Sequence, residues 1–194
     1  HAAHPVRRAV TETYATLTAD GAARPAILLA APYGDLGAAW PTVAATGVEA
    51  VAIDLVKGSA PAAGLAGLET KTLVAGVVDG HNIWRADLAG KLDQLEALTG
   101  TAGALAVATS TSLFHVPHDV ADETALDPRL VSWLAFADQK VTEVVTLATG
   151  LGSGRDAVAD ALATATAAPA DRAQAPGVAA PAVPARAAGP TDPD

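Results

Sequence analysis

The segment Thr72-Leu73-Val74-Ala75-Gly76-Val77-Val78 is a continuous apolar run that ends in the turn residues Asp79-Gly80. A strand with one face in solvent would alternate apolar and polar residues. This run instead has the composition of a strand in a parallel sheet covered by helices. Three further apolar runs predict strands of the same kind at residues 26–31, 48–56 and 104–108.

Helical patterns lie between and around these predicted strands. Residues 87–98 carry four leucines at helical spacing, which predicts an amphipathic helix. Asp127-Pro128 is typical of an N-cap followed by proline at the first helical position, and it predicts one long helix that ends near Gly150. A further helix is expected from about residue 6 to 17. Strands that alternate with helices predict an α/β fold with right-handed crossovers.

The domain organisation follows from these elements. We expect an N-terminal helix within residues 1–23, βα units over 24–151 and a weak helix over 152–167. The Pro/Ala-rich tail over 168–194 is expected to be disordered. A closed βα barrel needs eight strands, so four predict either an open α/β sheet or a partial (βα) TIM-type barrel with half missing. Because the chain begins with His1, we expect it to be processed or cut from a longer protein.

Composition excludes several classes of function. The formal net charge is −9, and the 12 Lys and Arg residues are scattered, so nucleic acid and anionic membranes are not expected partners. No apolar run approaches the roughly 20 residues that span a bilayer, and no signal-peptide pattern is present. A cytoplasmic protein is therefore expected. The absence of cysteine excludes disulfides, thiolate zinc sites and a cysteine nucleophile.

Two local patterns suggest ligand sites and have simpler explanations. His115, His118 and Asp119 share one short loop, but no third ligand at helical spacing accompanies the two histidines, so we favour ordinary loop hydrogen bonds over a metal site. Residues 150–154 are glycine-rich like a phosphate-binding loop. They follow a predicted helix rather than a strand, which favours helix termination.

Function in parallel α/β proteins concentrates at the carboxyl ends of the strands. We call the candidate set there the strand-end rim, and its members are Asp35, Asp54, Asp79, His81 and His115. These titratable groups could bind a ligand. Since Asp and Gly also form ordinary turns before helices, a structural role is the favoured interpretation.

Residues 77–88, Val-Val-Asp-Gly-His-Asn-Ile-Trp-Arg-Ala-Asp-Leu, closely resemble a segment in the N-terminal domain of cobalamin-independent methionine synthases. Two further blocks, Ser110–Pro117 and Leu126–Lys140, resemble that family in the same order and spacing. The resemblance covers roughly residues 24–151, the second half of that domain. It departs from the family at His81, where an arginine is usual, and at Thr111, where a cysteine is usual.

The resemblance implies an enzyme of two βα barrels that transfers a methyl group from methyltetrahydrofolate polyglutamate to homocysteine. It also implies a zinc ion, held by His, Cys, Glu and Cys of the C-terminal barrel, which activates the homocysteine thiol. This chain has no cysteine. The folate-contacting basic residues of the family lie upstream of the matched region. We therefore expect no catalytic, cofactor-binding or metal-binding residue here.

The resemblance favours the half-barrel interpretation. The expected role is structural support within a methionine synthase, with no methyl transfer by this chain alone. The expected partners are the C-terminal catalytic barrel and the missing N-terminal half-barrel, and an unpaired sheet edge predicts self-association. The alternative is a stand-alone truncated homologue that binds a small ligand or a partner through the strand-end rim.

Overall fold

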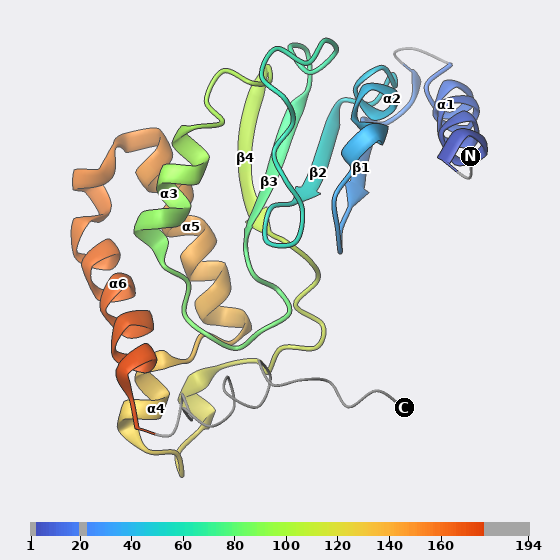
Figure 1. Ribbon diagram of the computed structural model, residues 1–194. Helices are drawn as coiled ribbons and strands as arrows, with labels where there is room; N and C mark the ends of the chain where they lie inside the picture. The colour runs from blue at the N-terminus through green and yellow to red at the C-terminus, as the bar shows by residue number, and fades with distance from the viewer. Residues whose placement is uncertain (1–2, 20–22, 177–194) are drawn as a thin grey trace, which may run out of the picture.

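The computed structural model describes residues 3–19 and 23–176, and it has the predicted α/β fold. Four strands form one all-parallel sheet, in the order in which they occur in the chain (Figure 1). Each strand coincides with a predicted segment to within about two residues. The strands are β1 (Leu28–Ala31), β2 (Ala50–Asp54), β3 (Thr72–Val78) and β4 (Ala104–Thr109).

The described residues also form α-helices and short 3-10 turns. The α-helices are α1 (Ala3–Leu17), α2 (Trp40–Ala44), α3 (Leu88–Glu96), α4 (Pro128–Trp133), α5 (Ala137–Ser153) and α6 (Ala159–Gln174). The 3-10 turns are η2 (Gly37–Ala39), η3 (Val120–Asp122) and η4 (Arg155–Val158). The expected opening helix and leucine-rich helix are present as α1 and α3, whereas the short α2 was not predicted.

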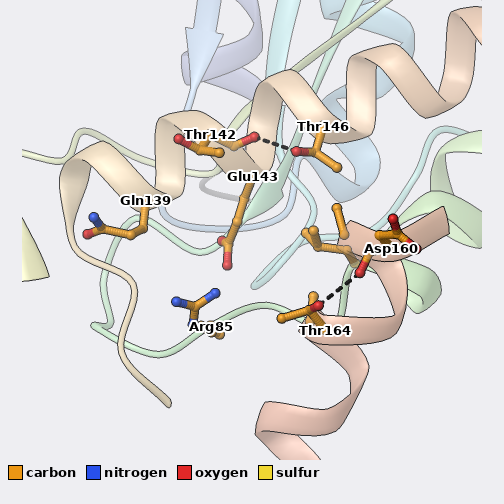
Figure 2. Close-up of a pocket in the computed structure, with 10 residues that line it drawn as sticks. Arg85, Gln139, Thr142, Glu143, Thr146, Asp160 and Thr164 are labelled. Atoms are coloured by element: carbon orange, nitrogen blue, oxygen red, sulfur yellow. Dashed lines mark hydrogen bonds between the residues drawn. The ribbon is translucent and has the colours of Figure 1, made fainter. Parts of the chain in front are cut away.

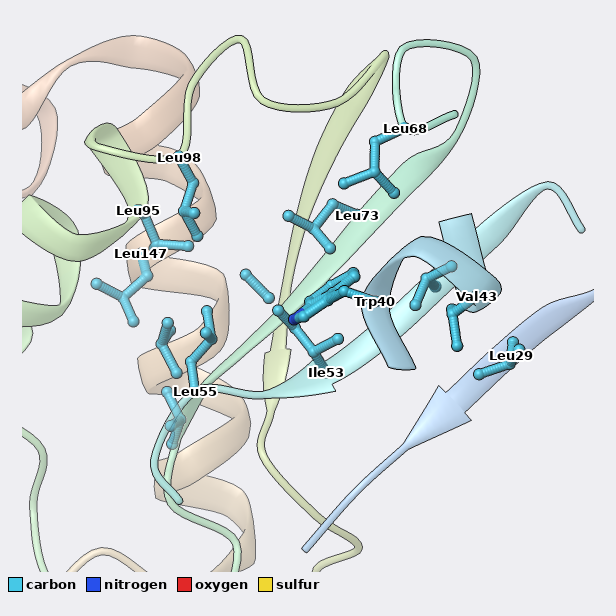
Figure 3. Close-up of a cluster of buried hydrophobic side chains, with 14 of the residues drawn as sticks. Leu29, Trp40, Val43, Ile53, Leu55, Leu68, Leu73, Leu95, Leu98 and Leu147 are labelled. Atoms are coloured by element: carbon cyan, nitrogen blue, oxygen red, sulfur yellow. The ribbon is translucent and has the colours of Figure 1, made fainter. Parts of the chain in front are cut away.

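One face of the sheet is buried against helices. Val51, Leu73 and Ala75 are fully buried on this face. Figure 3 shows Trp40 of α2 lying over the strands, with Leu147 of α5 in the same cluster. Helices α3, α5 and α6 lie together on one side of the sheet (Figure 1). The single large hydrophobic core of the described chain therefore sits between one sheet face and the helices.

The opposite face has a different composition. Ala30, Ala52, Val74 and Ala106 form one row across the four strands, and we call this surface the open face. These side chains are small, and none of them is fully buried. Among the described residues they belong to no buried hydrophobic cluster. The sheet is thus covered on one side only.

The prediction of one long helix from Asp127 to Gly150 was wrong. The Asp127 carboxylate does cap a helix, because it accepts the N–H of Arg129 at 2.8 Å. That helix, α4, stops at Trp133 and α5 begins at Ala137. Between them the chain pairs with the segment after β3, and the Ala135 N–H donates to the Ile83 carbonyl at 2.8 Å. This extended pairing interrupts the helix.

The helical structure extends further towards the C-terminus than predicted. Helix α5 ends at Ser153, and its C-cap Gly154 has a φ of 92°, which glycine readily adopts, so the helix-termination interpretation of residues 150–154 is confirmed. Helix α6 then continues through Pro169 to Gln174, beyond the predicted limit at residue 167. Residues 168–174 are therefore helical, and the rest of the predicted tail from 177 onward lies outside the described residues.

The described helices are also too short or too polar for a bilayer. None of those within residues 3–19 and 23–176 has the length and hydropathy of a membrane-spanning segment.

Candidate functional site

The strand-end rim is organised by its aspartates. Asp54, at the end of β2, is only 1% exposed, and its carboxylate accepts the N–H groups of Tyr33, Val56 and Lys57 at 3.1, 2.8 and 2.9 Å. Tyr33 has a φ of 70°, a conformation unfavourable for a residue with a Cβ, and its hydrogen bond to Asp54 helps to hold it. The Asp54 carboxylate is therefore committed to binding the turns after β1 and β2.

Asp35 has a similar role on the surface. Its carboxylate accepts the Ser59 N–H at 2.7 Å, and it also contacts the Ser59 hydroxyl and the Gly37 N–H. The hydrogen bond from the Ser59 hydroxyl is the main cause of a lowered pKa for Asp35. This carboxylate thus joins the loop after β1 to the loop after β2.

Asp79 and His81 lie together after β3. Asp79 accepts the His81 N–H and the Asn82 side-chain amide, each at 2.7 Å. The exposed His81 ring is 3.1 Å from the Lys57 ammonium through Nδ1 and lies 5.0 Å from the Tyr33 ring centre. The rim therefore contains a small polar cluster built from the ends of three strands.

In the described structure, no hydrogen bond, ion pair or ring contact joins His115 to the other rim members. His115 is exposed in the loop after β4, where its ring packs edge-on against Phe114, with the ring centres 5.1 Å apart. The neighbouring His118 lies 3.7 Å from Asp138, whereas Asp119 accepts hydrogen bonds from the Ala121 N–H and the Gln139 amide. In the part of the chain that the structure describes, no three His, Asp or Glu side chains converge as metal ligands.

Two buried ionisable residues of α5 were not predicted as part of any site. Lys140 is fully buried, and its ammonium donates to the Asn82 side-chain oxygen and the Trp84 carbonyl, each at 3.2 Å. Burial lowers the pKa of Lys140. Glu143 is 7% exposed, and burial raises its pKa although its carboxylate accepts the Ala86 N–H at 3.0 Å. Both residues bind the segment after β3 to α5.

One cavity, with a volume of about 420 Å³, lies between α5 and α6. Figure 2 shows the Glu143 carboxyl group pointing toward Arg85 across this cavity. One oxygen of Glu143 and the Nε of Arg85 are buried without a hydrogen-bond partner. Sequence reasoning did not find this cavity, because α5 and α6 were not expected to form a pair, and Thr142, Thr146 and Thr164 read as ordinary helix residues.

Comparison with known proteins places the chain in a family. Residues 2–103 match the family model described as "Cobalamin-independent synthase, N-terminal domain". The chain belongs to the cobalamin-independent synthase family. This finding confirms the family resemblance, and the motif at residues 77–88 lies within the matched range.

Curated relatives of this cobalamin-independent synthase chain are named 5-methyltetrahydropteroyltriglutamate–homocysteine methyltransferase. The relative from Rhodococcus jostii is 55% identical over 149 residues, which are 77% of this chain and 20% of the relative. Relatives from Mycobacterium tuberculosis and Mycobacterium leprae are 50% and 47% identical over 169 residues, 87% of this chain and 22% of each relative. The chain thus spans about a fifth of the length of these relatives.

Proposed function

We propose that this chain is a structural portion of the N-terminal domain of a cobalamin-independent methionine synthase. It would complete a βα barrel that supports the partner domain in which the methyl group passes from methyltetrahydrofolate polyglutamate to homocysteine. The proposed partners are the rest of the N-terminal barrel and the C-terminal catalytic barrel. A cytoplasmic location accompanies this proposal, as in biosynthetic enzymes that need no membrane.

The main support for this proposal is the strand order of the sheet and the composition of its open face. The strands follow one another in chain order, without the reversal that creates a ligand-binding crevice in doubly wound sheets. An uninterrupted order is what an arc of a barrel requires. The open face also consists of small apolar side chains at Ala30, Ala52, Val74 and Ala106, and parallel sheets are normally covered on both faces. A second half-barrel would enclose this face.

The strand-end rim supports a structural role for the same residues. Asp35, Asp54 and Asp79 each accept two or more hydrogen bonds from loop residues, so their carboxylates are engaged within the chain. His115 lies apart from them in an exposed loop. This arrangement favours the structural proposal over the alternative of a stand-alone ligand-binding protein.

The residues of this chain do not fit the zinc site that the family implies. The sequence contains no cysteine, and the described histidines, aspartates and glutamates form no group of three around a common point. We therefore assign no step of methyl transfer to these residues. The zinc chemistry belongs, in this proposal, to the C-terminal barrel.

Complementation tests the proposal. The chain would be co-purified with a polypeptide that supplies the remaining segments of the Mycobacterium tuberculosis relative, and homocysteine methylation would be measured for each part and for the mixture. We expect a stable complex, activity only in the mixture, and no stoichiometric zinc in the chain alone. Tight zinc binding by the pure chain, or failure of the two parts to associate, would overturn the proposal.

A further inference from the structure

A second cavity, of about 210 Å³, lies among the segments that follow β2 and β3 and the helices α3, α5 and α6. Four of its lining side chains are cationic, and we call it the basic cavity. They are Arg85, Lys91, Lys140 and Arg172. Asp79 is the one carboxylate in the lining. In a chain of net charge −9, such a concentration of positive charge around one space is unexpected.

These cations lack the carboxylate partners that several other basic residues of the chain have. Arg24, Arg129 and Arg155 each form an ion pair with a carboxylate at the surface. Within the described residues, no ion pair joins a carboxylate to any of the four cations of the basic cavity. The Nε of Arg85 and one terminal nitrogen of Arg172 are buried with no hydrogen-bond acceptor. Unpaired buried donors of this kind are costly unless an acceptor is supplied.

Asp79, the carboxylate in the lining, does not supply the acceptor that these donors need. Both oxygens of Asp79 are engaged, by the His81 N–H and by the Asn82 amide. The Lys140 ammonium has only neutral acceptors, the Asn82 side-chain oxygen and the Trp84 carbonyl, and a lysine ammonium has three donors. One donor of Lys140 is therefore left for another acceptor.

The walls hold the cations in place. The Arg172 guanidinium lies over the Trp84 ring, 4.4 Å from its centre, which fixes a side chain from the end of α6 against the segment after β3. Glu143, one turn after Lys140 on α5, faces the neighbouring larger cavity and accepts the Ala86 N–H. Its carboxylate also points toward Arg85 (Figure 2) and lies close enough to Lys140 to interact with its charge, as does Asp79. Two negative charges thus face four positive ones, and a net positive charge remains around the basic cavity.

We propose that the basic cavity binds a small oxyanion, a phosphate group or a carboxylate group, through Lys91, Lys140 and Arg172 with Arg85. Its volume is below the roughly 300–1,000 Å³ of pockets for larger organic ligands, so a compact anion suits it. Charge-assisted hydrogen bonds from several converging cations are the usual means of holding such a group. The inference does not depend on the structural role proposed above.

Titration of the full chain tests this site. Inorganic phosphate and succinate would be the two probes, followed by calorimetry, with sodium chloride at matched ionic strength as the screening control. The test variants are Lys91→Gln and Arg172→Gln, which each remove one charge from partly exposed positions of the cavity wall. Arg8→Gln removes one charge from exposed α1 and is the matched control.

We expect saturable binding of at least one probe, with affinity reduced about tenfold or more in each test variant and unchanged in Arg8→Gln. Binding of phosphate alone or of succinate alone identifies which group the site takes. If circular dichroism shows that one test variant is unfolded, the wild-type titration and the other variant decide. Absence of saturable binding of both probes below ~10 mM, or equal binding by all variants, would overturn the proposal.

Discussion

At the scale of single residues, the sequence predicted what depends on near neighbours. The cap at Asp127 satisfies N–H groups two and three positions ahead, so the Asp-Pro dipeptide reveals it. Lys140 could not be assigned in this way, because its acceptors at Asn82 and Trp84 are 58 and 56 positions away. In the sequence alone, a lysine that is buried in the fold cannot be distinguished from a surface lysine.

Asp54 offers a direct test of the structural interpretation of the strand-end rim. We expect Asp54→Ala to lower the free energy of unfolding by about 2–4 kcal/mol, because three backbone N–H groups lose a charged acceptor in a buried setting. Urea denaturation of the purified chain measures the change. The loss should also free Tyr33 from its left-handed conformation.

The matched control is Asp122→Ala, an exposed aspartate with no side-chain hydrogen bond in the described structure. Its effect should stay within about 0.5 kcal/mol. If Asp54→Ala were as stable as this control while the binding of some ligand disappeared, the rim would be a ligand site and the structural interpretation would fail.

At the scale of elements, the strands were the most predictable part. The largely apolar runs at residues 26–31, 48–56, 72–78 and 104–108 all became strands. The helix after Asp127 was not predictable in the same way. Its interruption depends on the pairing of residues 133–135 with residues 83–85. The helical periodicity of the sequence does not indicate this distant contact.

Helix α6 provides a pH-dependent test at this scale. Asp171 joins α6 to α4, because it accepts two hydrogen bonds from Arg129 at 2.7 and 2.9 Å and one from the Trp133 indole at 2.8 Å. The hydrogen bonds from Arg129, followed by that from Trp133, lower the pKa of Asp171 from 3.8 to about 2. A lowered folded-state pKa means that the contribution is complete above pH 4 and is lost as the pH falls through about 2.

We therefore expect amide protection in α6 to decrease between pH 4 and pH 2 in the wild-type chain, as hydrogen exchange can measure. Asp171→Asn should show weaker protection already at pH 7 and should lack this acid-dependent step. Asp156→Asn, an exposed aspartate in η4, serves as the control and should behave like the wild type. An unchanged pH profile in Asp171→Asn would show that this contact does not hold α6.

At the scale of the whole molecule, the sequence left open whether four parallel strands make a flat open sheet or part of a barrel. Continuous apolar strands are compatible with both, since both bury parallel strands under helices. The strand order resolves part of the question. Its uninterrupted sequence from β1 to β4, together with one face of small side chains, is compatible with a barrel arc and lacks a crevice between strands.

This architecture makes a final prediction about association. The open face and the outer edges of β1 and β4 lack partners in the described chain, so we expect concentration-dependent self-association in analytical ultracentrifugation. Val74→Lys places a charge on the open face and should reduce association while keeping the helical circular dichroism. Ala75→Lys, the next residue, buries its charge under the helices and should destabilise the fold by at least about 3 kcal/mol. If Val74→Lys unfolded the chain as Ala75→Lys does, both faces would already be covered in the isolated chain. The second half-barrel of the proposal would then have no surface on which to pack.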